Sequence, residues 1–211
     1  MQEPALRGGF GEWRHLAGVY ALVQGALWTT GGTQLVFALL AAAWVLLSTF
    51  LAARTPRQLG ITLSGLTQSL WVVPATMCVA GLLILGGWMT GSLHDLHGRH
   101  APLWHGLLYL VWAFVQQFML QSFLFVRLEA VLGDGRKAVL ATALLFSVAH
   151  IPNAVLVAAT FVLAMVVTEV FRRHRNLYPL AIAHGLLGLA LAVSLPDALT
   201  HHMRVGIAYW N

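Results

Sequence analysis

The run AFVQQFMLQSF, Ala113 to Phe123, decides how this chain is interpreted, because it places three glutamines inside one of its most apolar stretches. The amides of Gln116, Gln117 and Gln121 are neutral, yet burying a polar group without a hydrogen-bond partner is costly. A helix that carries them must therefore direct them at other polar groups. The rest of the sequence shows what surrounds this helix.

The composition is that of a membrane protein. Hydrophobic residues make up 59% of the 211 residues and charged residues only 9%, whereas a soluble domain has about 25% charged residues. So few charges cannot cover a globular surface, and we expect an all-α, polytopic transmembrane helix bundle. Residues 1–211 are expected to form a single integral membrane domain surrounded by the lipid bilayer.

Seven apolar runs, each bounded by glycine, proline or charge, are candidate membrane spans. They are Leu16–Thr30, Gln34–Ala53, Thr67–Met89, Leu103–Phe125, Ala138–His150, Ala154–Phe171 and Tyr178–Leu195.

The distribution of cations favours seven spans with a cytoplasmic N-terminus. Seven spans place ten Lys and Arg residues on one side and only Arg99 and Arg204 on the other, which is the asymmetry typical of cytoplasmic loops. If the first run lay flat on the membrane, the ratio would fall to 8:4. The same topology explains the net charge of +5, so we expect no nucleic-acid partner.

Polar groups inside the predicted spans need a structural or a functional reason. Counted along the helix from Arg127, Gln117 lies about 15 Å deep, and His150 and His184 lie at similar depth on two other spans. Each polar residue alone could be interhelical hydrogen-bond glue, worth roughly 0.6 to 2 kcal/mol. Their common depth predicts instead that Gln117, His150 and His184 face one cavity.

Motifs around these residues resemble a known family. The run FSVAH, Phe146 to His150, resembles the FxxxH motif of the CAAX-protease and bacteriocin-processing (CPBP) family of intramembrane proteases. In that family FxxxH follows a helix with EExxxR, where this chain has QQFMLQ, Gln116 to Gln121. A later family helix carries histidine followed four positions on by Asn or Asp, and here His184 is followed by Gly188. The resemblance covers a CPBP-like core of about residues 103–196.

The resemblance implies a glutamate-dependent peptidase that activates water within or beside the membrane. A glutamine cannot take a proton from water, so His150 or His184 would have to act as the base. The candidate catalytic residues are thus His150, His184, Gln116, Gln117 and Gln121. The two histidines are also the candidate metal ligands, although a catalytic zinc usually takes three protein ligands and a water. No cofactor is assigned, and a divalent metal such as zinc stays open.

Three functions remain open at this point. The first is a membrane peptidase with variant site chemistry that acts on a membrane protein or peptide. The second is a pseudoprotease that binds or scaffolds a membrane partner, similar in logic to the Aph subunit of gamma-secretase. The third is a small transporter or proton relay that uses the intramembrane histidines. In each case we expect an integral protein of a bacterial inner membrane.

Overall fold

The computed structural model describes residues 3–52, 54–94 and 102–210, and all regular elements in this part of the chain are helices. In chain order they are α1 Glu3–Leu27, α2 Gly31–Leu51, α3 Leu66–Ser69, α4 Val72–Thr90, α5 Pro102–Gln117, the π-helix η1 Phe118–Phe125, α6 Val126–Leu132, α7 Gly135–Val148, α8 Ala154–His174, α9 Tyr178–Ser194, α10 Asp197–Thr200 and two short 3-10 helices, η2 His201–Met203 and η3 Gly206–Trp210.

The predicted all-α membrane bundle is confirmed, since every predicted apolar run falls largely within a helix. Four helical stretches are long and apolar enough to cross a membrane: Gly31–Leu51, Leu66–Thr90, Gly106–Leu132 and Ala154–His174. Helix α9 is apolar but shorter. Helices α1 and α7 do not meet the same criterion over their described residues, so their crossing of the membrane stays a prediction.

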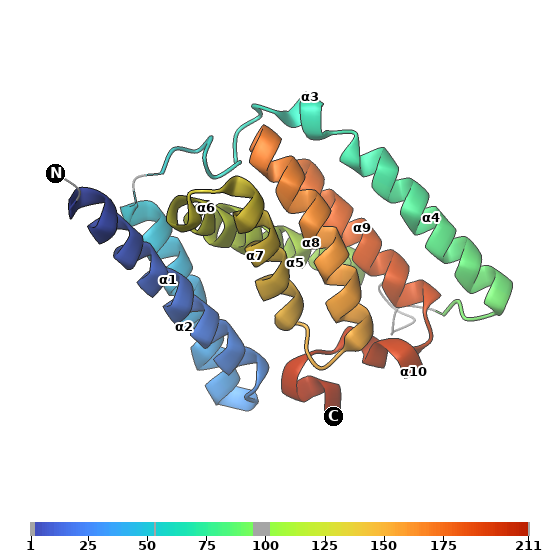
Figure 1. Ribbon diagram of the computed structural model, residues 1–211. Helices are drawn as coiled ribbons and strands as arrows, with labels where there is room; N and C mark the ends of the chain where they lie inside the picture. Colours follow the sequence, from blue (N-terminus) through green and yellow to red (C-terminus); the bar gives the residue numbers. More distant parts are fainter. Residues whose placement is uncertain (1–2, 53, 95–101, 211) are drawn as a thin grey trace.

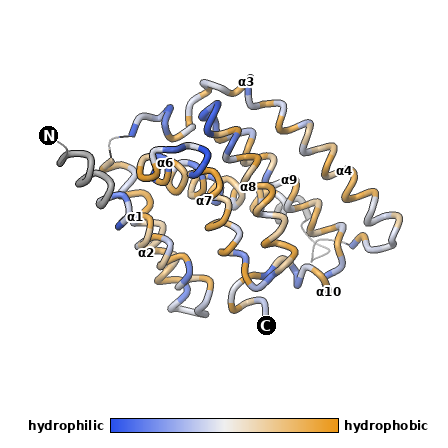
Figure 2. Tube along the Cα trace, viewed as in Figure 1, coloured by the Kyte–Doolittle hydropathy of each residue, from blue (hydrophilic) through white to orange (hydrophobic). Residues whose placement is uncertain are grey.

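The helices form one bundle with the two termini at opposite ends (Figure 1). Helices α1 and α2 make an antiparallel hairpin on one side, and α4 runs along α9 on the other. Between them lie α7, α8 and the continuous helix made of α5, η1 and α6. Hydrophilic residues gather where α6 turns into α7 and where α8 ends (Figure 2).

Local sequence signals fix where the central helices begin and end. Gly133, with a φ of 63° that favours glycine, follows the last residue of α6. Asp134 then caps α7 by accepting hydrogen bonds from two backbone amides of its first turn. Asn153 caps α8 in the same way through the amide of Leu156, at 3.1 Å. These caps produce the tight turns on both sides of α7.

The core of the bundle is apolar and its outer face is apolar too. Phe125 and Phe171 meet edge to face at 6.0 Å between ring centroids and are fully buried. Large exposed side chains on α2 and α4, including Phe50, Leu82 and Trp88, point outward. A surface of this kind is stable only in lipid, as the composition predicts.

Arg127 is wholly buried, which corrects its use as a marker of the cytoplasmic surface. Its Nε lies 3.2 Å from a carboxylate oxygen of Glu12. One of its terminal nitrogens donates to the hydroxyl of Ser48 at 3.1 Å, and its guanidinium lies 4.0 Å from the ring centroid of Phe123. The second oxygen of Glu12 accepts a hydrogen bond from Arg54 at 2.6 Å. These groups join α1, α2 and α6.

Candidate active site

A cavity of about 1220 Å³ lies among the helices, and most of its lining is apolar. Three of the five predicted site residues line it, namely Gln116, His150 and His184. They come from α5, from the turn after α7 and from α9. The cavity thus brings together residues that are far apart in the sequence.

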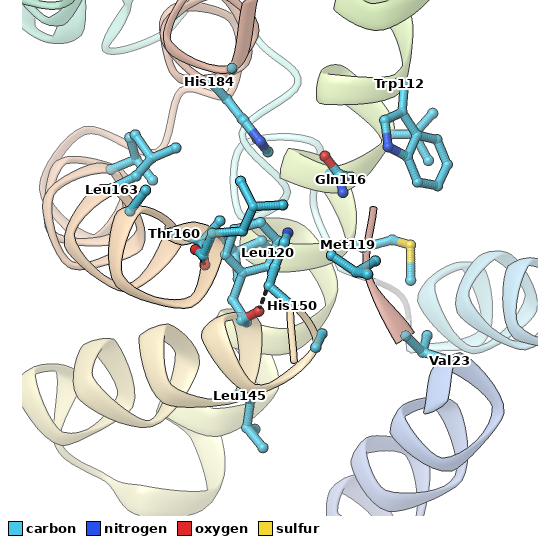
Figure 3. Close-up of a pocket in the computed structure, with 18 of the residues that line it drawn as sticks. Val23, Trp112, Gln116, Met119, Leu120, Leu145, His150, Thr160, Leu163 and His184 are labelled. Atoms are coloured by element: carbon cyan, nitrogen blue, oxygen red, sulfur yellow. Dashed lines mark hydrogen bonds between the residues drawn. The ribbon is translucent and has the colours of Figure 1, made fainter. Parts of the chain in front are cut away.

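The two histidines of the cavity lie against one aromatic ring, and Gln116 faces them. In Figure 3, Gln116 and His184 point toward one another across the pocket, and His150 lies close by. The ring of Phe146, the first residue of the FSVAH run, has its centroid 4.8 Å from that of His150 and 5.8 Å from that of His184. The two imidazole centroids are therefore within about 11 Å of each other.

Gln117 and Gln121 lie behind the cavity wall, which corrects the expectation that Gln117 faces the cavity. Both are fully buried, and neither lines the cavity. The Gln117 amide donates to Nδ1 of His184 at 3.1 Å. The Gln121 amide donates to Oε1 of Gln117 at 3.2 Å and to the hydroxyl of Thr168 at 3.1 Å. This buried chain of hydrogen bonds fixes the orientation of the His184 ring.

The hydrogen bonds at Nδ1 place the two histidines in opposite tautomers. Nδ1 of His150 lies 2.7 Å from the carbonyl oxygen of Phe146, which can only accept, so Nδ1 carries the proton and Nε2 keeps its lone pair. Nδ1 of His184 accepts from the Gln117 amide, so its Nε2 carries the proton. One neutral imidazole can accept a proton and the other can donate a hydrogen bond.

The helix that carries the glutamines changes its winding at the site. The π-helix η1 starts at Phe118, directly after Gln117, and runs to Phe125. Such segments occur often at functional sites, because the wider turn redirects side chains. Within it, the buried hydroxyl of Ser122 donates to the backbone oxygen of Leu59 at 2.6 Å. The loop between α2 and α3 is thereby attached to the site helix.

Tyr109 is a site residue that the sequence reasoning missed. It lines the cavity, and a Cβ added at Gly188 would lie only 1.9 Å from its hydroxyl oxygen. The tyrosine hydroxyl thus stands where the resemblance implies an Asn or Asp side chain. A usable signal was present, because Tyr109 precedes Gln116 by seven residues, about two helical turns on the same face.

The cavity lining contains no aspartate or glutamate among the described residues. Glu169 accepts hydrogen bonds from Arg172 and Arg173, each at 2.7 Å, and Glu129 is paired with Arg175. Both carboxylates are therefore engaged away from the cavity.

The residues present do not fit a catalytic zinc centre. His150 and His184 supply two ring nitrogens, one fewer than the three protein ligands that such a centre takes. The part of the chain that the structure describes holds no group of three or more His, Cys, Asp or Glu residues suited to a metal.

Comparison with known proteins identifies the segment that builds this site. Residues 98–190 match the family model described as type II CAAX prenyl endopeptidase Rce1-like. The matched segment contains QQFMLQ, FSVAH and His184. No curated protein and no solved structure matches the chain. The segment that holds the site is therefore similar to the Rce1-like family of type II CAAX prenyl endopeptidases.

Proposed function

We propose that this protein is a CPBP-type intramembrane peptidase that cleaves a membrane-embedded peptide. A histidine, in place of a glutamate, activates the water, and a second histidine stabilises the oxyanion. The observation that carries this proposal is the pair of opposite histidine tautomers at one cavity. Peptide hydrolysis needs a base for water and a hydrogen-bond donor for the oxyanion. His150 and His184 supply one of each.

In the proposed reaction, Nε2 of His150 takes a proton from water while the water oxygen attacks the peptide carbonyl carbon. Nε2–H of His184 donates a hydrogen bond to the carbonyl oxygen as it becomes an oxyanion. His150 then returns the proton to the leaving amine as the carbon–nitrogen bond breaks. The Gln116 amide orients the water or the substrate, since it can donate and accept but cannot carry the proton away.

The apolar lining supports a hydrophobic substrate. Residues such as Val79 on α4 and Val162 on α8 surround the polar groups with aliphatic surface. An apolar peptide segment, or a peptide end that carries a lipid anchor, would bury its hydrocarbon there and present a peptide bond to the histidines. The prenylated peptides in the family's description are one such substrate class.

A second candidate function is a pseudoprotease that holds a membrane partner without cleaving it. The absence of a carboxylate from the described cavity lining favours this candidate. General-base catalysis contributes typically about 10²- to 10⁴-fold. A site whose histidine base is poorly placed would therefore bind its substrate and turn it over negligibly.

A reconstituted assay separates the two candidates. The protein in lipid nanodiscs is mixed with a quenched fluorescent peptide that carries a hydrophobic anchor, and binding and cleavage are both measured. We expect cleavage that His150→Ala abolishes while peptide binding persists. His174→Ala, which changes a histidine outside the cavity, is the control and should cleave like the wild type. Binding without cleavage would establish the pseudoprotease, and neither binding nor cleavage would refute both candidates.

A further inference from the structure

A second, polar pocket lies at the cation-rich end of the bundle, and none of its described lining residues also lines the cavity. Its volume is about 350 Å³, near the lower end of the range of about 300 to 1,000 Å³ for ligand sites. The loop after α2, helix α6 and Arg175, which directly follows α8, form its walls. Its polar lining residues are Arg54, Thr55, Arg57, Gln58, Glu129 and Arg175.

The charges around this pocket leave an excess of cations. Among the described residues, three guanidinium groups line the pocket and Glu129 is its one carboxylate, which pairs with Arg175. Arg54 pairs with Glu12, but Glu12 also neutralises the buried Arg127. The two carboxylates thus pair with three arginines, and Arg57 has no carboxylate partner among the described residues. In addition, Nε of Arg54 is buried and has no hydrogen-bond partner among the described residues, which is unfavourable unless a ligand supplies an acceptor.

The donors of this pocket are held in place before any ligand arrives. The guanidinium of Arg175 lies over the rings of Phe125 and Phe171, 5.2 and 5.5 Å from their centroids. In the loop, the amide of Thr55 donates to the Gln58 side chain at 2.9 Å, and the amide of Gln58 donates to the Thr55 hydroxyl oxygen at 3.2 Å. Both side chains direct an oxygen at the loop, which leaves the Gln58 NH₂ group as a donor. Ordering these groups costs little on binding.

We infer that this pocket binds a phosphate group, supplied by the headgroup of an anionic phospholipid or by free phosphate. Guanidinium groups match phosphate oxygens with two parallel hydrogen bonds, and basic pockets between transmembrane helices at the cytoplasmic face bind lipid headgroups. The cation-rich end faces the cytoplasm in the predicted topology. This inference is independent of the proposed peptidase activity.

Arg57 provides the test, because its side chain is exposed and forms no ion pair among the described residues. Arg57→Gln removes one cation without breaking an internal contact. Arg136→Gln is the matched control, because Arg136 is also exposed at this end and lies outside the pocket. One arm measures lipid retention by native mass spectrometry from neutral detergent containing equal amounts of phosphatidylglycerol and phosphatidylcholine. The other follows the unfolding temperature during titration with potassium phosphate at constant ionic strength.

We expect the wild type to retain phosphatidylglycerol in preference to phosphatidylcholine. Arg57→Gln should weaken phosphatidylglycerol binding about fivefold, as for loss of one cation at a membrane surface. Arg136→Gln should leave this binding unchanged. Stabilisation by phosphate in the wild type but not in Arg57→Gln, without a lipid preference, would support the same site with free phosphate as its ligand. The inference is overturned if neither anion binds, or if both variants weaken binding equally.

Discussion

Gln117 sets the proton position on His184. An amide NH₂ group must donate to Nδ1 at this contact, which leaves the Nε2 proton directed away from Gln117. A carboxylate at the same position would accept from Nδ1–H and leave a lone pair on Nε2. The difference between Gln and Glu at residue 117 therefore decides whether His184 is a donor or a second base.

Gly188 is required by the tyrosine that faces it. A Cβ at this position would overlap the hydroxyl of Tyr109 and lie 2.7 Å from its Cζ. We predict that Gly188→Ala lowers the free energy of unfolding by about 1 to 3 kcal/mol, as for overpacking. Thermal unfolding in detergent measures the change.

Gly81→Ala on α4 is the control, because the Cβ that this change adds would have no described atom within 4 Å beyond its chain neighbours and its own helix backbone. The same measurement on the double variant Tyr109→Ala/Gly188→Ala should recover part of the loss relative to Tyr109→Ala alone. A Gly188→Ala variant as stable as the control would contradict the contact.

At the level of elements, the buried charge cluster holds the first hairpin on the bundle. Glu12 of α1 is shared by Arg127 of α6 and by Arg54, which follows α2. Glu12→Gln would leave a wholly buried guanidinium without its carboxylate. We predict a loss of about 3 to 5 kcal/mol in the free energy of unfolding, measured by chemical denaturation in mixed micelles.

Glu129→Gln is the matched control for this prediction. Glu129 also pairs with an arginine, but both side chains are partly exposed, and such pairs contribute about 0 to 1 kcal/mol. Equal losses in the two variants would show that the Glu12 cluster does not hold the hairpin.

Helix α7 starts at a titratable cap. Hydrogen bonds from the backbone amides of Arg136 and Lys137 lower the pKa of Asp134 below its usual 3.8. Because the folded-state pKa is depressed, this stabilisation is present above pH 3.8 and is lost as the pH falls through the lower folded-state value. Asp134→Asn keeps the cap but removes the charge. We predict that the free energy of unfolding of this variant depends less on pH in the acidic range than that of the wild type.

Asp134→Ala should instead destabilise α7 at neutral pH, because it removes the cap itself. Hydrogen exchange of the first turn of α7 measures both effects. Equal protection in wild type and Asp134→Ala at neutral pH would rule out the capping role.

Hydropathy predicted the helices but not all their ends. The first predicted run begins at Leu16, whereas α1 begins at Glu3 and includes Glu12. Glu12 fits in a helix at the bundle because arginines more than forty residues away neutralise it, and a local pattern does not contain these partners. The π-helical winding after Gln117 was missed for a related reason, since helical periodicity assumes one winding throughout.

At the scale of the whole molecule, an odd number of crossings places the termini on opposite sides of the membrane, consistent with their opposite ends in Figure 1. We predict that a reporter fused after Asn211 lies outside and that one inserted at residues 133–135 lies inside. Paired alkaline phosphatase and fluorescent-protein fusions measure this. The reverse pattern would invert the proposed location of the phosphate pocket.

The convergence of polar groups from three spans was predictable, because polar groups at one depth have few other places to go. The glutamine expected at the cavity was Gln117, however, and the glutamine that lines it is Gln116. The division of roles between the glutamines was not. Gln116 and Gln117 are neighbours in the sequence, so they point in different directions around the helix, and hydropathy does not tell which one faces the cavity. Tyr109 was missed because its relation to Gly188 exists only once α5 packs on α9.

The central claim has two parts. Neutral amides occupy the positions of the family's carboxylates, so His150 acts as the base, and a site with carboxylates at these positions would be faster. The most direct test of this claim compares kcat/KM of the wild type and the triple variant Gln116→Glu/Gln117→Glu/Gln121→Arg in the nanodisc assay. The arginine matters because two uncompensated carboxylates in a buried site would protonate or disrupt packing.

We predict that activity rises by about 10²-fold or more in the triple variant, because the carboxylate added by Gln116→Glu at the cavity outweighs the loss of the His184 Nε2–H donor caused by Gln117→Glu. Activity should stay lower in the double variant without arginine and disappear when His150→Ala is added. Two results together would contradict this account: a wild-type kcat of about 1 to 10³ s⁻¹, which is the normal enzymatic range, and a slower triple variant.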